Sequence, residues 1–352
     1  MLQQTAWLLL ALLAPLGACA TVASCDAQEL AAPAPEQVPA ALFQYPGAPF
    51  EASDGNLWFS TVGAGLVGFD GTNYVTFTRA DGLAADSVRD ILEDDEGRLM
   101  IATTGGVSRY EDGTFTTLTD YGDLEVTSTF TEDGDHRDVW DLALDRSGTL
   151  WITTLAGVFR HDGTRFVEFP LPVVAAPGAF EFTPKFVYSV MEAKDGALWF
   201  GTDGAGAVRY DGETTQVYTV KDHGLASDRV CTILEDGRGD LWFGTSDGGV
   251  SRYDGDSFTT HLESTAFSEH TGWGRYMAIH EDRAGDVWFG VASQGGGAYR
   301  WNGATFRYFS EQEGLNSSGI PSISEDRSGT LWFGTTTGVF RREGERFVAL
   351  GR

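Results

Sequence analysis

Three short landmarks recur together seven times along this chain of 352 residues. The first is an apolar triplet, usually Leu-Trp-Phe, whose copies lie 42 to 51 residues apart and begin at Leu57, Leu99, Leu150, Leu198, Leu241, Val287 and Leu331. The second is a Gly two residues before each triplet, and the third is an Asp-Gly, Asn-Gly or Glu-Gly pair after it. Self-similarity at such a period is typical of a repeat architecture, and no other feature limits the fold as strongly.

Each copy divides into four short apolar segments separated by turn residues. In the second copy we expect strands at 88–93, 98–103, 107–110 and 114–118. Four antiparallel strands per repeat form one blade of a β-propeller, so the sequence predicts an all-β fold with seven blades around a central channel. The Asp-Gly pairs fit two-residue hairpin turns, which need positive φ at both central positions.

The Trp of each triplet is expected to fill the gap between two adjacent blades, because each blade buries both of its faces. These structural residues are Trp58, Trp151, Trp199, Trp242, Trp288 and Trp332, and Met100 takes the place of the Trp in the second copy. The first copy lacks the Val-x-x-Ile pattern of the other first strands. We therefore leave two ways of closing the ring open: side-chain packing, or an outer strand formed around 43–45.

The fifth copy can be compared with known repeats over a long stretch. Its pattern is Gly224-Leu225, Val230-x-x-Ile233, Glu235-Asp236, Gly239-x-Leu241-Trp242-Phe243-Gly244-Thr245, Gly249-Val250, Arg252-Tyr253 and Asp254-Gly255. This pattern resembles the two-component regulator propeller repeat, and the resemblance covers about residues 48–352. It implies a sensor-like, extracytoplasmic propeller that binds a ligand. Members of that type usually continue into a transmembrane helix and a kinase, so we expect this single ring to have no signalling domain of its own.

The N-terminus has the features of an export signal. The apolar run from Ala6 to Leu16 is too short to span a bilayer comfortably but has the length of a signal-peptide core. Leu16-Gly17-Ala18-Cys19 resembles the lipobox of bacterial lipoproteins, which implies a lipid on Cys19, with Cys25 as the alternative. We therefore predict a signal peptide with a lipobox over 1–19, a flexible Ala- and Pro-rich tether over 20–40 and the propeller over 41–352.

The charge of the chain excludes some classes of partner. The formal net charge is −27, which argues against binding to nucleic acid or to anionic lipid surfaces, because both require Lys and Arg contacts. We expect a monomer in the bacterial cell envelope, on the periplasmic face or at the outer membrane, that touches the membrane only through its lipid. Cys231 lies inside an apolar segment and is expected to be a buried hydrophobe rather than half of a disulfide.

No strong catalytic motif is present, and no cofactor or metal is predicted. The six His residues show no ligand spacing. Glu-Asp pairs recur at Glu93-Asp94, Glu235-Asp236, Glu281-Asp282 and Glu325-Asp326. Paired carboxylates can serve acid–base chemistry, but a catalytic pair is needed only once, so the repetition favours a role in capping turns.

Binding residues are predicted where the repeat is broken. Three connections from a fourth strand to the next first strand are long, 120–138, 170–185 and 263–275, and all should open on one face of the ring. Trp140 and Tyr188 occupy one equivalent position in the first strands of blades 3 and 4, where blades 2 and 5 have Arg89 and Cys231. Aromatic and Arg side chains in a rigid concave site are typical anchors. The candidate ligand-binding residues are Phe130, His136, Trp140, Tyr188, Trp273, Arg275 and Tyr276.

Three functions remain open at this point. The leading one is a non-enzymatic binding module for a small extracellular ligand, a glycan being one candidate, or for a membrane signalling protein. The second is a metal-dependent lyase or hydrolase, because streptogramin lyases are similar seven-bladed propellers with a metal and His at one mouth of the channel; His270 and His280 are the nearest candidates here. The third is an assembly scaffold at the outer membrane.

Overall fold

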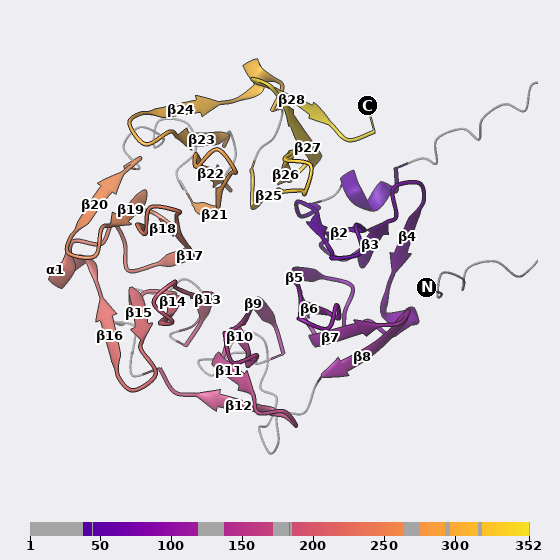
Figure 1. Cartoon of the computed structure of the whole chain (residues 1–352), viewed down its shortest axis with the longest axis horizontal. Coiled ribbons are helices and arrows are strands. Elements are labelled where there is room, and N and C mark those ends of the chain that lie inside the picture. Colours follow the sequence, from indigo (N-terminus) through magenta and orange to yellow (C-terminus); the bar gives the residue numbers. More distant parts are fainter. Residues whose placement is uncertain are drawn as a thin grey trace, which may run out of the picture. The chain divides into compact units, whose positions relative to one another are not determined.

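The computed structural model describes residues 38–43, 45–118, 137–171, 183, 185–263, 275–292, 296–315 and 319–351. The described residues all belong to one compact unit. Within this unit the described strands form seven four-stranded antiparallel sheets in a ring, which confirms the predicted seven-bladed β-propeller (Figure 1). No helix of the described ranges is long and apolar enough to cross a membrane.

Blades 1 to 4 hold the first sixteen strands. In chain order they are β1 (Phe50–Glu51), β2 (Leu57–Ser60), β3 (Leu66–Phe69), β4 (Tyr74–Phe77), β5 (Val88–Glu93), β6 (Leu99–Thr103), β7 (Gly106–Glu111), β8 (Thr114–Leu118), β9 (Val139–Leu144), β10 (Leu150–Thr154), β11 (Gly157–His161), β12 (Phe166–Phe169), β13 (Val187–Glu192), β14 (Leu198–Thr202), β15 (Ala207–Tyr210) and β16 (Thr215–Tyr218). The strands predicted for the second copy are correct to within one residue at each end.

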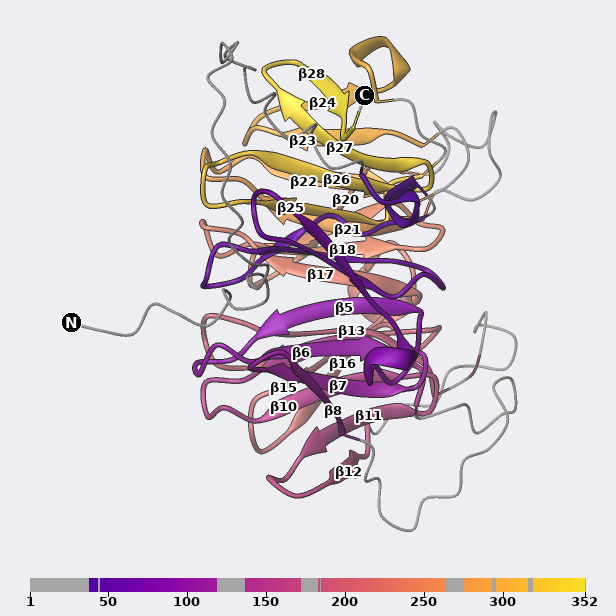
Figure 2. The same cartoon turned by 90° about the vertical axis from the view of Figure 1, so that its right-hand side faces the viewer.

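Blades 5 to 7 hold the remaining strands. These are β17 (Val230–Glu235), β18 (Leu241–Thr245), β19 (Val250–Tyr253), β20 (Phe258–His261), β21 (Tyr276–Glu281), β22 (Val287–Val291), β23 (Ala298–Trp301), β24 (Phe306–Phe309), β25 (Ser322–Glu325), β26 (Leu331–Thr335), β27 (Gly338–Glu343) and β28 (Arg346–Ala349). The first strand of each blade lies innermost and the fourth lies at the rim (Figure 1). The inner strands run roughly along the ring axis, whereas outer strands such as β12, β16 and β20 lie across it. The connections between strands lie at the two faces of the ring (Figure 2).

The helical elements of the described residues are single turns. One lies at the N-terminal edge, η1 (Ala40–Phe43), and three lie in the short connections between blades: η2 (Arg79–Asp81), α1 (Val220–His223) and η4 (Glu311–Glu313). Each of those three begins after a Thr or Ser whose hydroxyl accepts a backbone N–H, and each ends at a left-handed Gly. The caps keep these connections compact.

The triplet Trp residues pack between blades as predicted. Each is at most 7% exposed, and each lies against the triplet of the next blade. Trp242, for example, contacts Val287 and Phe289, with its ring 5.2 Å from that of Phe289. In blade 2, Met100 takes this place and packs against Leu150 and Ile152. The core of the molecule is therefore a circle of seven similar apolar interfaces.

The Asp of the Glu-Asp pairs caps the turn between the first and second strands, as the repetition predicted. Asp236 accepts the backbone N–H groups of Arg238 and Asp240 on Oδ1, and its Oδ2 accepts the indole N–H of Trp242 at 2.9 Å. The same carboxylate-to-indole bond recurs in blades 3, 6 and 7. One residue thus joins the turn to the interface between blades.

The turn at the third landmark, between the third and fourth strands, differs from the prediction. Only Asp112-Gly113 forms a two-residue turn with positive φ at both positions. In blades 1, 3, 4, 5 and 6 the loop has two more residues and only its Gly has positive φ. There the Asp or Asn side chain accepts backbone N–H groups two and three residues ahead, as Asp70 does from Thr72 and Asn73. These loops are therefore stabilised by side-chain hydrogen bonds, and they do not need two consecutive residues with positive φ.

The ring is closed by side chains, not by an added outer strand. Residues around Phe43 form η1, whose Leu42 is 1% exposed and packs against Phe59 of blade 1 and Trp332 and Val339 of blade 7. Hydrogen bonds add to this packing: the N–H of Ala48 donates to Ser322 Oγ at 2.7 Å, and the N–H of Arg327 donates to the Glu51 carboxylate. Closure therefore depends on the segment just before β1.

Candidate functional site

A cavity of about 400 Å³ lies in the central channel, where the first strands of the blades meet. Every blade contributes to its wall. Tyr45 and Val62 come from blade 1, and Arg89, Trp140 and Tyr188 come from blades 2, 3 and 4. Small-molecule sites typically enclose roughly 300–1,000 Å³ and combine apolar walls with a few placed polar groups. The channel meets both conditions and is the candidate site.

A β-bulge at the same place in five inner strands selects the side chains that line this cavity. In β5 the register with β6 shifts between Val88 and Asp90, which leaves Arg89 out of the pairing. A bulge redirects the side chain of the extra residue. The five bulge residues are Arg89, Trp140, Tyr188, Cys231 and Met277, and all of them line the cavity. The predicted equivalence of Trp140 and Tyr188 with Arg89 and Cys231 is confirmed.

Arg89 is held rigidly at the mouth of the channel. Its Nε and one terminal nitrogen donate to the two carboxylate oxygens of Asp138 at 2.9 and 3.1 Å. Asp138 is only 8% exposed and ends the connection from β8 to β9. The guanidinium carbon lies 3.9 Å from the centre of the Trp140 ring. A bidentate ion pair stacked on an indole fixes the guanidinium in one orientation.

Trp140 is the accessible member of an aromatic cluster. Its ring lies 4.7 Å from that of Phe186, which in turn lies 4.2 Å from Tyr188. Tyr188 is 3% exposed, and its hydroxyl donates to Asp203 at 3.4 Å, so it supports the wall from behind. Trp140 is half-buried and faces the cavity. Of the two predicted aromatic anchors, Trp140 therefore offers surface to a ligand.

Two carboxyl groups lie side by side on the same wall. Asp90 and Asp141 follow the bulges in β5 and β9, and their side chains are hydrogen-bonded to each other. Each also accepts a backbone N–H from the next blade, Asp90 from Leu142 at 3.2 Å and Asp141 from Val190 at 2.8 Å. Burial raises the pKa of both, and the charge of Asp90 raises that of Asp141 further. Both carboxyl groups therefore hold a proton more readily than they would in water.

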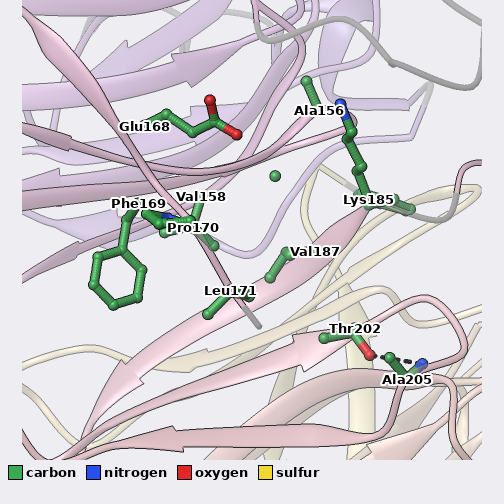
Figure 3. Close-up of a pocket in the computed structure, with 12 residues that line it drawn as sticks. Ala156, Val158, Glu168, Phe169, Pro170, Leu171, Lys185, Val187, Thr202 and Ala205 are labelled. Atoms are coloured by element: carbon green, nitrogen blue, oxygen red, sulfur yellow. Dashed lines mark hydrogen bonds between the residues drawn. The ribbon is translucent and has the colours of Figure 1, made fainter. Parts of the chain in front are cut away.

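A second pocket of about 260 Å³ lies between blades 3 and 4, on the face where the long connections open. Figure 3 shows Glu168 and Lys185 on opposite sides of it, above the apolar side chains of Leu171 and Val187. Phe186 lines this pocket and also packs on Trp140, so the two cavities share one wall. Binding in either cavity would bear on the same aromatic cluster.

The structure brings together part of the predicted site. Trp140 and Tyr188 line the channel, and Arg275 lies directly before β21, where its carbonyl accepts the N–H of Ala292. Tyr276 is 1% exposed, and its hydroxyl donates to the carbonyl of Leu262 at 3.2 Å, so it packs between blades 5 and 6 and does not line the cavity. The predicted residues Phe130, His136 and Trp273 lie outside the described residues, as do Cys19 and Cys25.

Several cavity residues were not predicted from the sequence. Tyr45 and Val62 are 57% and 60% exposed and line the blade 1 side of the channel. Asp90 and Asp141 do not stand out in the sequence, because each lies inside an apolar strand. Asp90 follows Arg89, and Asp141 follows Trp140. The signal was available: an Asp occupies the same repeat position only in blades 2 and 3, where other copies have Ser189, Thr232, Ala278 and Ser322.

The His candidates for metal chemistry do not meet in the described part of the site. His280 faces Trp288 across the β21–β22 pair, away from the cavity, with its Nε2 3.9 Å from the Glu325 carboxylate. Burial lowers the pKa of His280, and His270 lies outside the described residues. Within the described ranges, no group of three or more His, Cys, Asp or Glu side chains could hold a metal ion.

The family profile described as two component regulator propeller matches residues 181–204, 224–247 and 314–337. The chain carries two-component regulator propeller repeats. The matched segments cover the first two strands of blades 4, 5 and 7, where the sequence pattern was most regular. No curated protein matches the chain at a significant level.

Solved structures share the fold of these repeats. The extracellular domain of a protein described as a hybrid two component system of B. thetaiotaomicron is 20% identical with a TM-score of 0.65, over 84% of this chain and 39% of that one. This chain thus spans about two fifths of that domain. Virginiamycin B lyase from Staphylococcus aureus is 15% identical with a TM-score of 0.63, over 87% of this chain and 96% of that one. PorZ of Porphyromonas gingivalis, a component of the type-IX secretion system, is 18% identical with a TM-score of 0.64, over 88% of this chain and 47% of that one. At these identities the likeness shows the fold alone.

Proposed function

We propose that this propeller is a non-enzymatic binding module of the bacterial cell envelope, which takes a small ligand at the mouth of its channel and presents the same face to a signalling partner. The observation that carries the proposal is the wall of bulge residues, with Arg89 and Trp140 held in fixed orientations beside a cavity of about 400 Å³. Preformed sites of this kind bind with little loss of conformational entropy. The likeness to extracellular sensor domains supports the same function by analogy of fold.

The test is ligand binding by the purified protein and by a Trp140→Ala variant. A glycan and metabolite array supplies the ligands, and calorimetry measures their affinities. We expect Trp140→Ala to weaken binding at least tenfold, because it removes the accessible ring and the platform under Arg89. The control is Trp301→Ala on β23, whose side chain lies at the blade 5–6 interface away from the channel. Equal binding by both variants would place the site elsewhere.

An enzymatic role is the competing proposal, and it has its own experiment. The virginiamycin B lyase likeness covers nearly the whole enzyme, although it carries no residue-level match. Incubation of the protein with a cyclic depsipeptide and divalent metal ions would show ring opening by mass spectrometry. Turnover that depends on the metal would overturn the binding-only proposal; binding without turnover supports it.

Envelope anchoring through Cys19 remains part of the proposal. In a bacterial host, labelled palmitate should be incorporated by the natural chain and by Cys25→Ser but not by Cys19→Ser. One or more acyl chains on the first residue of the mature protein would anchor it at the membrane surface. Loss of label in Cys25→Ser alone would move the anchor to that residue, and label in neither parent nor variants would remove it.

A further inference from the structure

The channel wall carries an excess of negative charge in its described part. One Arg and two Asp side chains line the cavity there: Arg89, Asp90 and Asp141. The charge of Arg89 is balanced by the two oxygens of Asp138, and one face of its guanidinium is covered by Trp140. In the described part of the chain Asp90 and Asp141 have no basic partner, and their contacts are backbone N–H groups and each other. The unbalanced charge of the wall is therefore that of the acid pair.

The hydrogen bonds of the pair leave room for one more positive charge. Leu142 N–H donates to Asp90 Oδ2 and Asp141 Oδ1, and Val190 N–H donates to Asp141 Oδ2. Two carboxyl groups in contact need a proton between them or a cation beside them. In the unliganded channel a proton meets this need. An ammonium or guanidinium group, with several N–H donors, could take its place and satisfy both carboxylates.

A separate observation on the same wall concerns a buried hydroxyl group. Ser189 lines the cavity in the blade next to Asp141 and is 7% exposed. Its hydroxyl has no hydrogen-bond partner in the described structure. Buried hydroxyl groups are nearly always bonded, and an unbonded one costs about 1–3 kcal/mol. A donor group bound at the acid pair would be close to the backbone that carries this hydroxyl.

Aromatic surface near the pair also suits a cation. Trp140 lies next to Asp141 in β9, and Tyr45, which is 57% exposed, lines the same cavity from blade 1. Aromatic rings attract organic cations through their negative faces. The formal net charge of −27 raises the local concentration of cations around the molecule and lowers that of anions. Each of these effects favours the same sign of ligand.

We propose that the channel cavity selects an organic cation, with its ammonium or guanidinium group held between Asp90 and Asp141 and its apolar part against Trp140. This inference rests on the proposed ligand-binding function and adds the chemical class of the ligand. If Asp90 and Asp141 served only the fold, the affinity of the cavity would not depend on the charge of the ligand. A dependence on ligand charge therefore distinguishes a binding pair from a structural one.

Binding of a cation by this pair must release its shared proton. Affinity therefore rises with pH while the free pair remains protonated, by at most tenfold per pH unit. The other ionisable groups that face the pair are Arg89 and Asp138 beside β5 and β9, Tyr188 on β13, Cys231 on β17 and Tyr45 before β1. The part of the pH dependence that Asp141→Asn removes is therefore the part assigned to the pair.

The experiment uses three probes of matched shape and different charge: phenethylammonium, phenethyl alcohol and 3-phenylpropionate. Calorimetry on the full-length protein should give an affinity at least tenfold higher for the ammonium than for the other two. Repeating the titration in buffers of different ionisation enthalpy should show net proton release, and the affinity should rise from pH 5 to pH 7. Asp141→Asn should abolish the preference and the pH dependence together.

The matched control is Asp240→Asn, another buried carboxylate, which pairs with Arg252 and lies outside the cavity. It should leave all three affinities unchanged. If Asp141→Asn fails to fold, Asp90→Asn takes its place, because Asp90 bonds to β9 and its loss leaves the bond from Val190 of β13 to Asp141 intact. Circular dichroism checks the fold of each variant.

Other outcomes separate this inference from the proposed function. If neutral or anionic probes bind as well as the ammonium, or if Asp141→Asn and Asp90→Asn leave ammonium binding unchanged, the inference is overturned. The proposed binding function would still stand if those probes bind and Trp140→Ala lowers their affinity. If no probe binds and no ligand emerges from the array, both are overturned.

Discussion

The interfaces between blades 5 and 6 and between blades 2 and 3 solve the same packing problem differently. Between blades 5 and 6, Trp242 fills the gap, and the Glu281 carboxylate accepts the N–H of Gly237 in the preceding blade at 2.6 Å. Between blades 2 and 3, Met100 fills the gap, and Leu144 replaces that Glu at the end of β9. The regular interface has its polar contact near the turn, and the irregular one has it at the channel.

A bond like that of Glu281 recurs around the ring. The last residue of the first strand is a Glu in six blades, and each accepts a backbone N–H from the turn of the blade before it: Glu51, Glu93, Glu192, Glu235, Glu281 and Glu325. The first turn of blade 2 contains the acidic residues Asp95 and Glu96, so a Glu opposite them would be repelled. Leu144 avoids this repulsion. The polar links of that interface are Arg89 with Asp138 and Asp90 with Asp141.

This difference teaches that the repeat is broken where the site lies. Regular interfaces are stabilised near their turns and leave the channel wall free of charge. The 2–3 interface gives up the regular link and places an ion pair and an acid pair in the channel instead. Departures from a locally consistent pattern are expected at functional positions, and we therefore infer that this part of the channel wall is functional.

The largest expected effect comes from removing the side chain that fills each gap. Trp242→Ala should lower the free energy of unfolding by about 3–5 kcal/mol, because it leaves a large cavity between blades. Met100→Ala should cost about 2–3 kcal/mol, since fewer atoms are lost and the aliphatic neighbours can partly close the space. Urea denaturation followed by circular dichroism measures both. Equal losses would mean that the two interfaces are packed alike.

The second prediction concerns pH. Burial raises the pKa of Asp90 and Asp141, so the folded protein binds more protons than the unfolded chain above about pH 4. The stability that the pair contributes is therefore present at low pH and is lost as pH rises through its raised pKa, with a slope of at most about 1.4 kcal/mol per pH unit for each proton. Free energies of unfolding from pH 4.5 to 8 should show this slope in the natural chain but not in the Asp90→Asn/Asp141→Asn variant.

Asp211 supplies a control of opposite sign for that titration. Backbone N–H bonds from Thr214 and Glu213 lower the pKa of Asp211 to about 2. Its contribution is present above the unfolded pKa near 4 and is lost as pH falls. Asp211→Asn should therefore lower the stability by a constant amount above about pH 4 and change the slope of the profile only on its acid side. If it also removed the slope above pH 4.5, the slope could not be assigned to the channel pair.

The third prediction tries to convert the irregular interface into a regular one. Leu144→Glu alone should cost about 1–2 kcal/mol, because it loses apolar contact and faces Asp95 and Glu96. Adding Asp95→Arg should recover about 1 kcal/mol, since blades 3, 6 and 7 have Arg at that turn position opposite the Glu. A double-mutant cycle of unfolding free energies measures the coupling. Strictly additive effects would show that no new link had formed.

Much of the fold could be predicted because the information is repeated. The triplets, turns and strand limits recur seven times, so an error in one copy is corrected by the others. The channel wall could be predicted only in part. Alternation along a strand assigns a face to each side chain, but a bulge shifts that assignment, and the bulge at Arg89 or Trp140 becomes visible only in the pairing of strands.

Two further omissions have the same physical origin. Tyr45 precedes the one copy whose first strand is reduced to two residues, so no pattern marked it. The sequence suggests that the recurring Glu caps a turn together with its neighbouring Asp. In the structure the Glu carboxylate instead bonds to the preceding blade. Contacts between repeats cannot be read from the repeat alone. Phe130, His136 and Trp273 stay predictions, because they lie outside the described residues.

The smallest predicted effect compares regular interfaces with each other. Trp242 donates its indole N–H to Asp236, but in blades 1 and 4 that Asp is replaced by Ala52 and Ala193, and the indole N–H groups of Trp58 and Trp199 have no partner in the described structure. The turn at Ala193 has the same backbone bonds as the turn at Asp236, so a carboxylate placed there should reach the indole.

Ala193→Asp should therefore stabilise the protein by about 1 kcal/mol, through a bond that satisfies a buried donor. The decisive measurement is the same substitution in a Trp199→Phe background. Phe fills most of the same gap but has no N–H, so the gain should vanish there if it comes from the indole bond. A gain that survives in that background would come from the turn, where the new carboxylate can cap backbone N–H groups as Asp236 does, and the carboxylate–indole bond would then add nothing to the interface between blades.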